Sequence, residues 1–182
     1  MNKQGFKYKK EESIVGNLKD DFELSSQEFY TIFEFFIVSN ICRKGSLRKK
    51  SLKEYGWGSD SLNASGLRKQ LQGILSLDNN FVFLDKNEDI KSQFIKHDLD
   101  GRLESLICER GVIGYINEDN QYFKLFHRIR NCLAHGSFVL KYSFNKEKMV
   151  VMQDQDQYNV TARIVLKLKT LLAIISIVKK GK

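Results

Sequence analysis

The chain has 182 residues and contains no proline, the residue that most reliably interrupts a helix. Helices are therefore expected to end only at glycine or at Asn and Asp signals. Several segments carry the apolar spacing or the end signals of helices. These segments are 25–45, 59–77, 87–99, 101–111, 117–136 and 158–180.

Two of these expected helices have recognisable ends. Ser25 and Glu28 form a capping-box pattern at the start of the first, and Gly45 is expected to end it. The polar residues 117–120 supply a cap for the segment that follows them. Gly136 stands where a glycine commonly terminates a helix.

Strand patterns are confined to a small part of the sequence. Residues 137–144 and 148–153 alternate in polarity and predict a hairpin, whereas 79–85 fits either a strand or a buried connector. Helices with apolar stripes bury them best in a bundle. The expected fold is therefore all-α, a helical bundle with a small β-hairpin before the C-terminal helix. Residues 1–22 are interpreted as a polar basic arm, and 23–182 as one helical domain.

The charge balance favours a polyanionic partner. The formal net charge is +8 and the pI is about 9.3, which points to nucleic acid first. A basic strip precedes Tyr55 and Trp57, and phosphates could follow such a strip while bases stack on the aromatic rings. The RNA-binding candidates in this strip are Arg43, Lys44, Arg48, Lys49 and Lys50. A solvated connector is the alternative interpretation.

The cysteines indicate an unmodified, metal-free chain. Cys42, Cys108 and Cys132 lie far apart without a CxxC or Cys/His pair, so we expect reduced thiols in a cytoplasmic protein and no metal or other cofactor. The N-terminal residues are charged, and no signal peptide is expected. The most apolar run, 171–178, is far shorter than the ~20 residues that span a bilayer, so no membrane partner is expected.

The stretch FKLFHRIRNCLAHGSF, residues 123–138, holds the candidate site. Arg128, Arg130, Asn131 and His135 lie within eight residues near a helix end. Asn131 and His135 are four apart and share a helix face, whereas Arg130 and His135 are five apart and lie about 140° around the helix. An ordinary surface histidine at a helix end is the alternative interpretation.

These residue types suit RNA cleavage without a metal. An imidazole titrates near neutrality and can move protons. A guanidinium fits a phosphate and the charge that develops on it. An asparagine can orient the imidazole or hold a ribose hydroxyl. His97 and His127 are weaker candidates, and no glycine-serine pair with paired aspartates suggests a nucleotidyltransferase.

The motif RNCLAHG resembles the signature of the HEPN superfamily, in which an arginine is followed after four to six residues by a histidine. Arg130 and His135 match it, Asn131 fills the polar position, and Arg128 satisfies a looser form. The resemblance implies a bundle of four or five helices and a metal-independent endoribonuclease of the toxin or phage-defence type. It also implies a homodimer whose two motifs line one cleft.

By this resemblance Arg130 binds the phosphate, His135 is the general acid or base, and Asn131 positions them. Arg128 is the substitute for Arg130. RNA and a second copy of the chain are the expected partners, with an antitoxin or other neutralising protein as a further one. Because family members that only bind RNA or proteins keep such motifs, a non-catalytic binding module is the alternative function.

Overall fold

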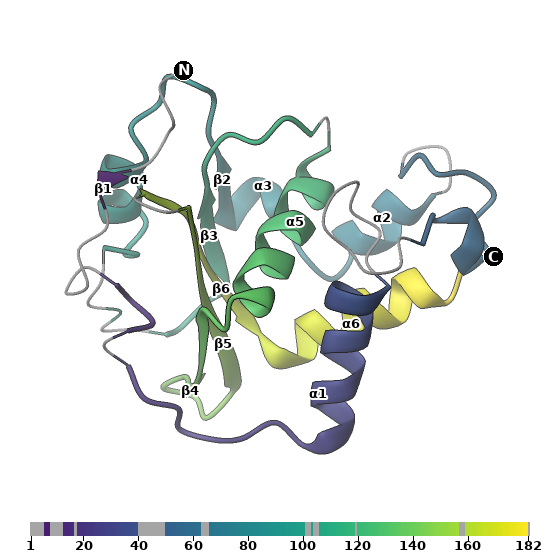
Figure 1. Ribbon diagram of the computed structural model, residues 1–182, viewed down its shortest axis with the longest axis horizontal. Helices are drawn as coiled ribbons and strands as arrows, with labels where there is room; N and C mark the ends of the chain where they lie inside the picture. The colour runs from purple at the N-terminus through teal and green to yellow at the C-terminus, as the bar shows by residue number, and fades with distance from the viewer. Residues whose placement is uncertain are drawn as a thin grey trace.

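The structure is a computed structural model of the chain. It describes residues 6–7, 13–16, 18–39, 50–62, 66–100, 103, 106–118, 120–156 and 159–181. Figure 1 shows a sheet seen nearly edge-on, with helices on both of its sides.

A mixed sheet forms the centre of the protein, which corrects the expectation of an all-α helical bundle. Within the described residues it has six strands in the order β2-β3-β6-β5-β4, with β1 pairing with β6. Only β2 and β3 run parallel, and the other pairs are antiparallel. The strands are β1 (Phe6–Lys7), β2 (Phe81–Phe83), β3 (Arg110–Ile113), β4 (Phe138–Tyr142), β5 (Lys148–Gln155) and β6 (Asn159–Lys167).

Helices cover the two faces of this sheet unequally. α1, α5 and α6 lie on one side and α4 lies on the other (Figure 1). The α-helices of the described residues are α1 (Ser26–Phe33), α2 (Leu67–Gln72), α3 (Leu77–Asn80), α4 (Ile90–Lys96), α5 (Gln121–Ala134) and α6 (Leu168–Lys179). A π-helical turn, Glu34–Val38, continues α1, and a 3₁₀ turn spans Lys53–Tyr55. None of the helices among these residues is long and apolar enough to cross a membrane.

The strands supply apolar side chains to a core on each face. Along β5, Val150 and Met152 join the larger core, which includes α1, α5 and α6. Met149 and Val151 join the smaller core, which includes α4. This alternation follows from the two-residue period of a strand. Central strands are thus apolar on both faces.

The expectation of one helix over 158–180 is wrong. Its first half is β6, and only its second half is α6. All seven interior residues of β6 are buried, including Thr161 and Arg163, so this strand is covered on both faces rather than on alternate residues. β-branched residues such as Val160 and Ile164 favour this extended conformation.

The helix expected over 101–111 is also absent from the described part of that segment, because its end belongs to β3. The capping box of Ser25 and Glu28 is confirmed, with both of its hydrogen bonds present. The hairpin is confirmed as β4 and β5, and the open alternative for 79–85 is resolved in favour of a strand, β2. Gly45, predicted to end the first helix, lies outside the described residues.

The edge strand β4 is covered by part of the segment interpreted as an arm. The Asp20 carboxylate accepts a hydrogen bond from the Leu140 N–H at 2.6 Å, and Asp21 accepts one from the Tyr142 N–H at 3.0 Å. The Asp21 N–H donates to the Leu140 carbonyl at 2.7 Å. These contacts satisfy backbone groups that an open edge would present to another strand.

Candidate functional site

The candidate residues lie on α5, which packs one side against the sheet. The Asn120 side chain accepts a hydrogen bond from the Tyr122 N–H at 2.9 Å and so caps the helix, as its place before the apolar stripe predicted. Phe126 meets Phe36 edge-on, with ring centroids 6.2 Å apart. Leu125 and Ile129 are fully buried in the same core. The opposite side of α5 is partly exposed.

The C-terminal end of α5 places His135 at the surface. Gly136 has a φ of +63°, the left-handed conformation that glycine adopts most readily. Its N–H donates to the Leu133 carbonyl, and the Ser137 N–H donates to the Cys132 carbonyl at 2.8 Å. These two bonds form a Schellman motif. The predicted stop at Gly136 is confirmed, and His135 is the exposed C-cap residue.

Arg128 points into the protein. Its Nη1 donates to Asp154 at 2.6 Å and to the Thr161 hydroxyl at 3.0 Å. Its Nη2 donates to the carbonyls of Gly114 and Tyr115, each at 3.2 Å. The guanidinium thus ties α5 to β5, to β6 and to the segment after β3. Its RNA contact stays a prediction, and any such contact would compete with these four internal bonds.

A β-bulge brings Thr161 into this network. Asp154 pairs with Ala162, whereas Gln155 pairs with Val160, so Thr161 is the extra residue of β6. The Thr161 hydroxyl donates to Asp154 at 3.0 Å. Bulges commonly redirect a side chain beside a functional site. Gly114 allows this close approach, since a Cβ there would lie 2.7 Å from the Thr161 carbonyl oxygen.

Arg130 and Asn131 are brought together at the rim of the network. The Arg130 Nη1 donates to the Asn131 Oδ1 at 3.0 Å. The Asn131 Nδ2 donates in turn to Asp154 at 3.4 Å. Both side chains are partly exposed. The chain of contacts therefore runs from a buried carboxylate to a guanidinium at the surface.

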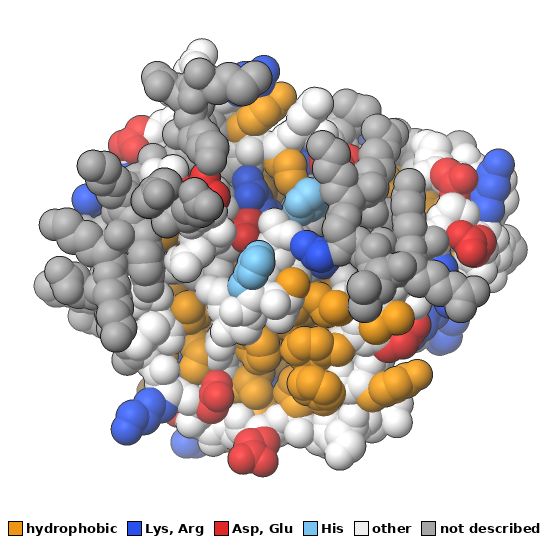
Figure 2. Space-filling model, viewed as in Figure 1, with side chains coloured by type: hydrophobic (Ala, Val, Ile, Leu, Met, Phe, Trp, Pro, Cys, Tyr) orange, Lys and Arg blue, Asp and Glu red, His pale blue; other side chains and the backbone are white. Residues whose placement is uncertain are grey.

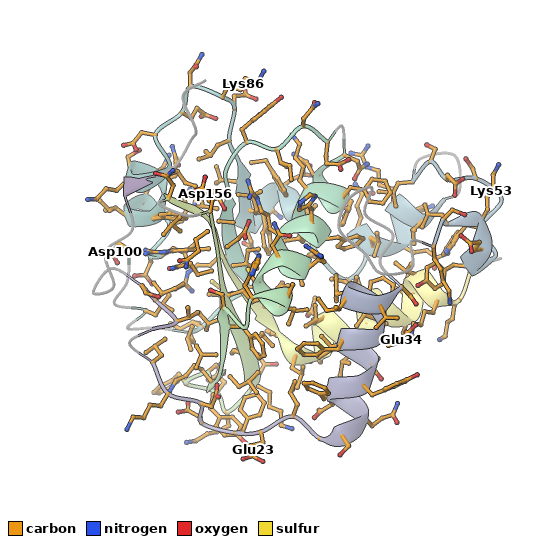
Figure 3. All side chains as sticks on the ribbon, in the orientation of Figure 1. Glu23, Glu34, Lys53, Lys86, Asp100 and Asp156 are labelled. Atoms are coloured by element: carbon orange, nitrogen blue, oxygen red, sulfur yellow. The ribbon has the colours of Figure 1, made fainter. Side chains whose placement is uncertain are left out.

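His135 is linked to this group through the backbone. Its N–H donates to the Asn131 carbonyl at 3.0 Å, and its ψ of 2° departs from the helical value. The imidazole is therefore carried by the C-cap residue, one turn after Asn131. Figure 2 shows histidine side chains with Lys or Arg and acidic side chains beside them in the middle of this face, above an apolar area. Figure 3 shows nitrogen- and oxygen-bearing side chains between the strands and α5.

Asp154 and Thr161 were not among the residues expected from the sequence. A signal for Asp154 exists, because it lies two and four residues after Met152 and Val150 in β5 and shares their inward face. An acid that continues the buried face of a strand requires a cation or donors around it. The bulge that brings in Thr161 has no comparable signal.

The remaining candidates are those of the basic strip, and the structure describes few of them. Arg43, Lys44, Arg48 and Lys49 of the basic strip lie outside the described residues. The Lys50 Nζ sits 5.3 Å from the centre of the Tyr55 ring. Trp57 is 4% exposed, and its indole N–H donates to the Val178 carbonyl. The indole is thus a core group and offers no open face for a base.

The thiols and acids do not form a metal site among the residues that the structure describes. Cys132 lies on the buried side of α5, and burial, together with the nearby Asp154 carboxylate, raises the pKa of its thiol. A thiol held protonated in this way is a poor nucleophile. Cys108 is exposed. The surface chemistry at the end of α5 therefore comes from Arg130, Asn131 and His135.

The chain matches no known family model, no curated protein and no solved structure.

Proposed function

We propose that the protein is a metal-independent endoribonuclease of the toxin or phage-defence type, with Arg130, Asn131 and His135 as its site. One observation carries the proposal. The Asn131 side chain accepts a hydrogen bond from the Arg130 guanidinium, and the exposed His135 lies one turn after Asn131, at the C-terminal end of α5. The formal net charge of +8 favours a polyanionic substrate for such a surface.

The chemistry follows from these groups. The His135 imidazole accepts the proton of a ribose 2′-hydroxyl, whose oxygen then attacks the adjacent phosphorus. Arg130 binds the phosphate and stabilises the additional negative charge of the transition state. The bond to the 5′-oxygen breaks, and that oxygen takes up a proton. The products carry a 2′,3′-cyclic phosphate and a 5′-hydroxyl.

A second copy of the chain would supply the second proton-transfer group. Each copy presents one His135 at the end of α5, and a two-fold arrangement would place two such ends along one RNA strand. Symmetric association also removes the need for Arg130 to act with the His135 of its own chain, which lies about 140° away on an ideal helix.

The resemblance to HEPN proteins now rests on the Arg130–His135 motif alone, since a mixed sheet replaces the expected bundle. The alternative function is a non-catalytic module that binds RNA or a neutralising protein. The residues of the site are common to both functions. Only an assay for RNA cleavage distinguishes the ribonuclease from the binding module.

The test is incubation of purified protein with single-stranded RNA in EDTA. We expect cleavage that leaves 2′,3′-cyclic phosphate ends, and a loss of about 100-fold or more in rate for His135→Ala, because general acid–base catalysis contributes on that order. His97→Ala is the matched control, since His97 is also a helix C-cap residue, on α4. RNA binding without cleavage by the wild-type protein would instead support the module.

A further inference from the structure

We propose that Asp154 is a positioning residue for Arg130 and that it acts through the side-chain amide of Asn131. The importance of this arrangement for RNA cleavage rests on the proposed function. The arrangement itself rests on the contacts between β5 and α5, and it can be measured without any substrate.

The anchor of the arrangement is a buried carboxylate. The Asp154 side chain is 3% exposed. Its Oδ2 accepts hydrogen bonds from Arg128, Thr161 and Asn131, at 2.6, 3.0 and 3.4 Å. The positive charge of Arg128 compensates the carboxylate inside the protein. A carboxylate surrounded in this way has little freedom to reorient.

The charge of Asp154 decides which way the Asn131 amide points. An ionised carboxylate only accepts hydrogen bonds, so only the NH₂ end of the amide can face it. The carbonyl end of Asn131 must then face outward. In that direction it meets the Arg130 Nη1 at 3.0 Å. A neutral amide in place of Asp154 would allow both orientations of Asn131.

The outward carbonyl fixes one edge of the Arg130 guanidinium. A long arginine side chain otherwise loses considerable conformational entropy when it binds a phosphate. Orientation before binding removes part of that cost and places the fork where charge develops. Asn131 is suited to this position because an aspartate there would put a second carboxylate against Asp154.

The first experiment measures Arg130 directly in RNA-free protein. The guanidinium NηH signals of Arg130, assigned by NMR with Arg130→Lys as the blank, should be resolved in the wild type because the Asn131 contact slows rotation. Asn131→Ala leaves the Arg128–Asp154 pair intact and should merge them into one averaged signal. Asp154→Asn should do the same. Signals that stay resolved in Asn131→Ala would overturn the proposal, as would averaged signals in the wild type.

The second experiment connects this arrangement to cleavage. Single-turnover rates should fall by up to about 100-fold in Asn131→Ala, the scale of a misplacement of ~1 Å. The same substitution should have almost no effect in an Arg130→Gln background. Equal losses in both backgrounds would show that Asn131 acts independently of Arg130, against the proposal.

The two proposals fail in different ways. Resolved Arg130 signals that collapse in Asn131→Ala, in a protein that cleaves no RNA, would leave the positioning role standing and refute the ribonuclease. Cleavage that depends on His135 but an Arg130 that is mobile in the wild type would do the reverse. If Asp154→Asn fails to fold, Asn131→Ala decides the matter alone.

Discussion

Arg128 on α5 and Asp154 on β5 form an ion pair of 2.6 Å, with side chains only 10% and 3% exposed. The two residues are far apart in the sequence, and the pair links a helix to a strand beneath it. The acceptors around Arg128 and the donors around Asp154 satisfy most of the remaining polar groups. Removing one partner of such a pair leaves the other as an uncompensated buried charge.

Arg128→Met is therefore expected to lower the free energy of unfolding by about 3–5 kcal/mol, because it leaves Asp154 as an uncompensated buried charge. Urea unfolding followed by circular dichroism measures the change. The double variant Arg128→Met with Asp154→Leu should lose less than the sum of the two single variants. Strictly additive losses would mean that the two charges do not interact in the folded protein.

Gly136→Ala should destabilise the protein by about 1–2 kcal/mol, the cost of a left-handed conformation for an L-residue. The φ of +63° is the only obstacle, because a Cβ at this position meets nothing within 4 Å. Gly58→Ala is the matched control, since its Cβ also meets nothing and its φ is not in the left-handed region. Equal thermal midpoints for the two variants would contradict the Schellman geometry at the end of α5.

The hydrogen bonds of the Asp21 carboxylate, which cover the edge of strand β4, should weaken in acid. The hydrogen bond from Lys141 and the N–H of Tyr142 hold the pKa of Asp21 below its usual value of 3.8. A lowered folded-state pKa means that this stabilisation is complete above the unfolded pKa and is lost as the pH falls through the folded one. The unfolding free energy of wild type should approach that of Asp21→Asn below pH of about 3.8.

Light scattering provides the companion measurement, because an uncovered edge strand promotes association. Asp21→Asn should associate more than wild type near neutral pH, and the difference should vanish in acid. Glu147→Gln is a suitable control, since hydrogen bonds from Lys167 and Lys169 also lower the pKa of Glu147 but it does not cover β4. An equal increase in scattering for this variant would remove the special role of Asp21.

The basic strip makes a prediction about salt. Neutralising Lys49 and Lys50 to glutamine should reduce the slope of log K against log salt for single-stranded RNA by about 0.7 for each phosphate that the variant no longer binds. Fluorescence anisotropy with labelled RNA at several salt concentrations gives this slope. Lys96→Gln, on α4 at the other face of the sheet, serves as the control. An unchanged slope would identify the strip as a solvated connector.

Local features of the fold could be predicted because neighbouring residues determine them. The capping box at Ser25 and the glycine end of α5 at Gly136 depend on hydrogen bonds within a few residues. β6 could not be distinguished from a helix, because a strand buried on both faces does not show the two-residue alternation of apolar and polar residues. Arg163 added a misleading polar position, yet it is 1% exposed and donates to the Leu99 carbonyl.

The candidate site was only partly predictable for a related reason. Arg130, Asn131 and His135 could be selected because they lie close together in one segment. Whether Arg128 faces solvent or the core depends on Asp154, 26 residues further along. That partner becomes visible only when the sheet is assembled. The different roles of Arg128 and Arg130 could therefore be assigned only from the fold.

The central place of β6 has a consequence for the newly made chain. This strand pairs with β1, β3 and β5, yet it is synthesised after all of them. Until residue 167 has left the ribosome, the edges of β3 and β5 that β6 joins have no partner strand, and unpaired edges attract other chains. Translation speed and chaperone supply during that interval should therefore govern the yield of folded protein.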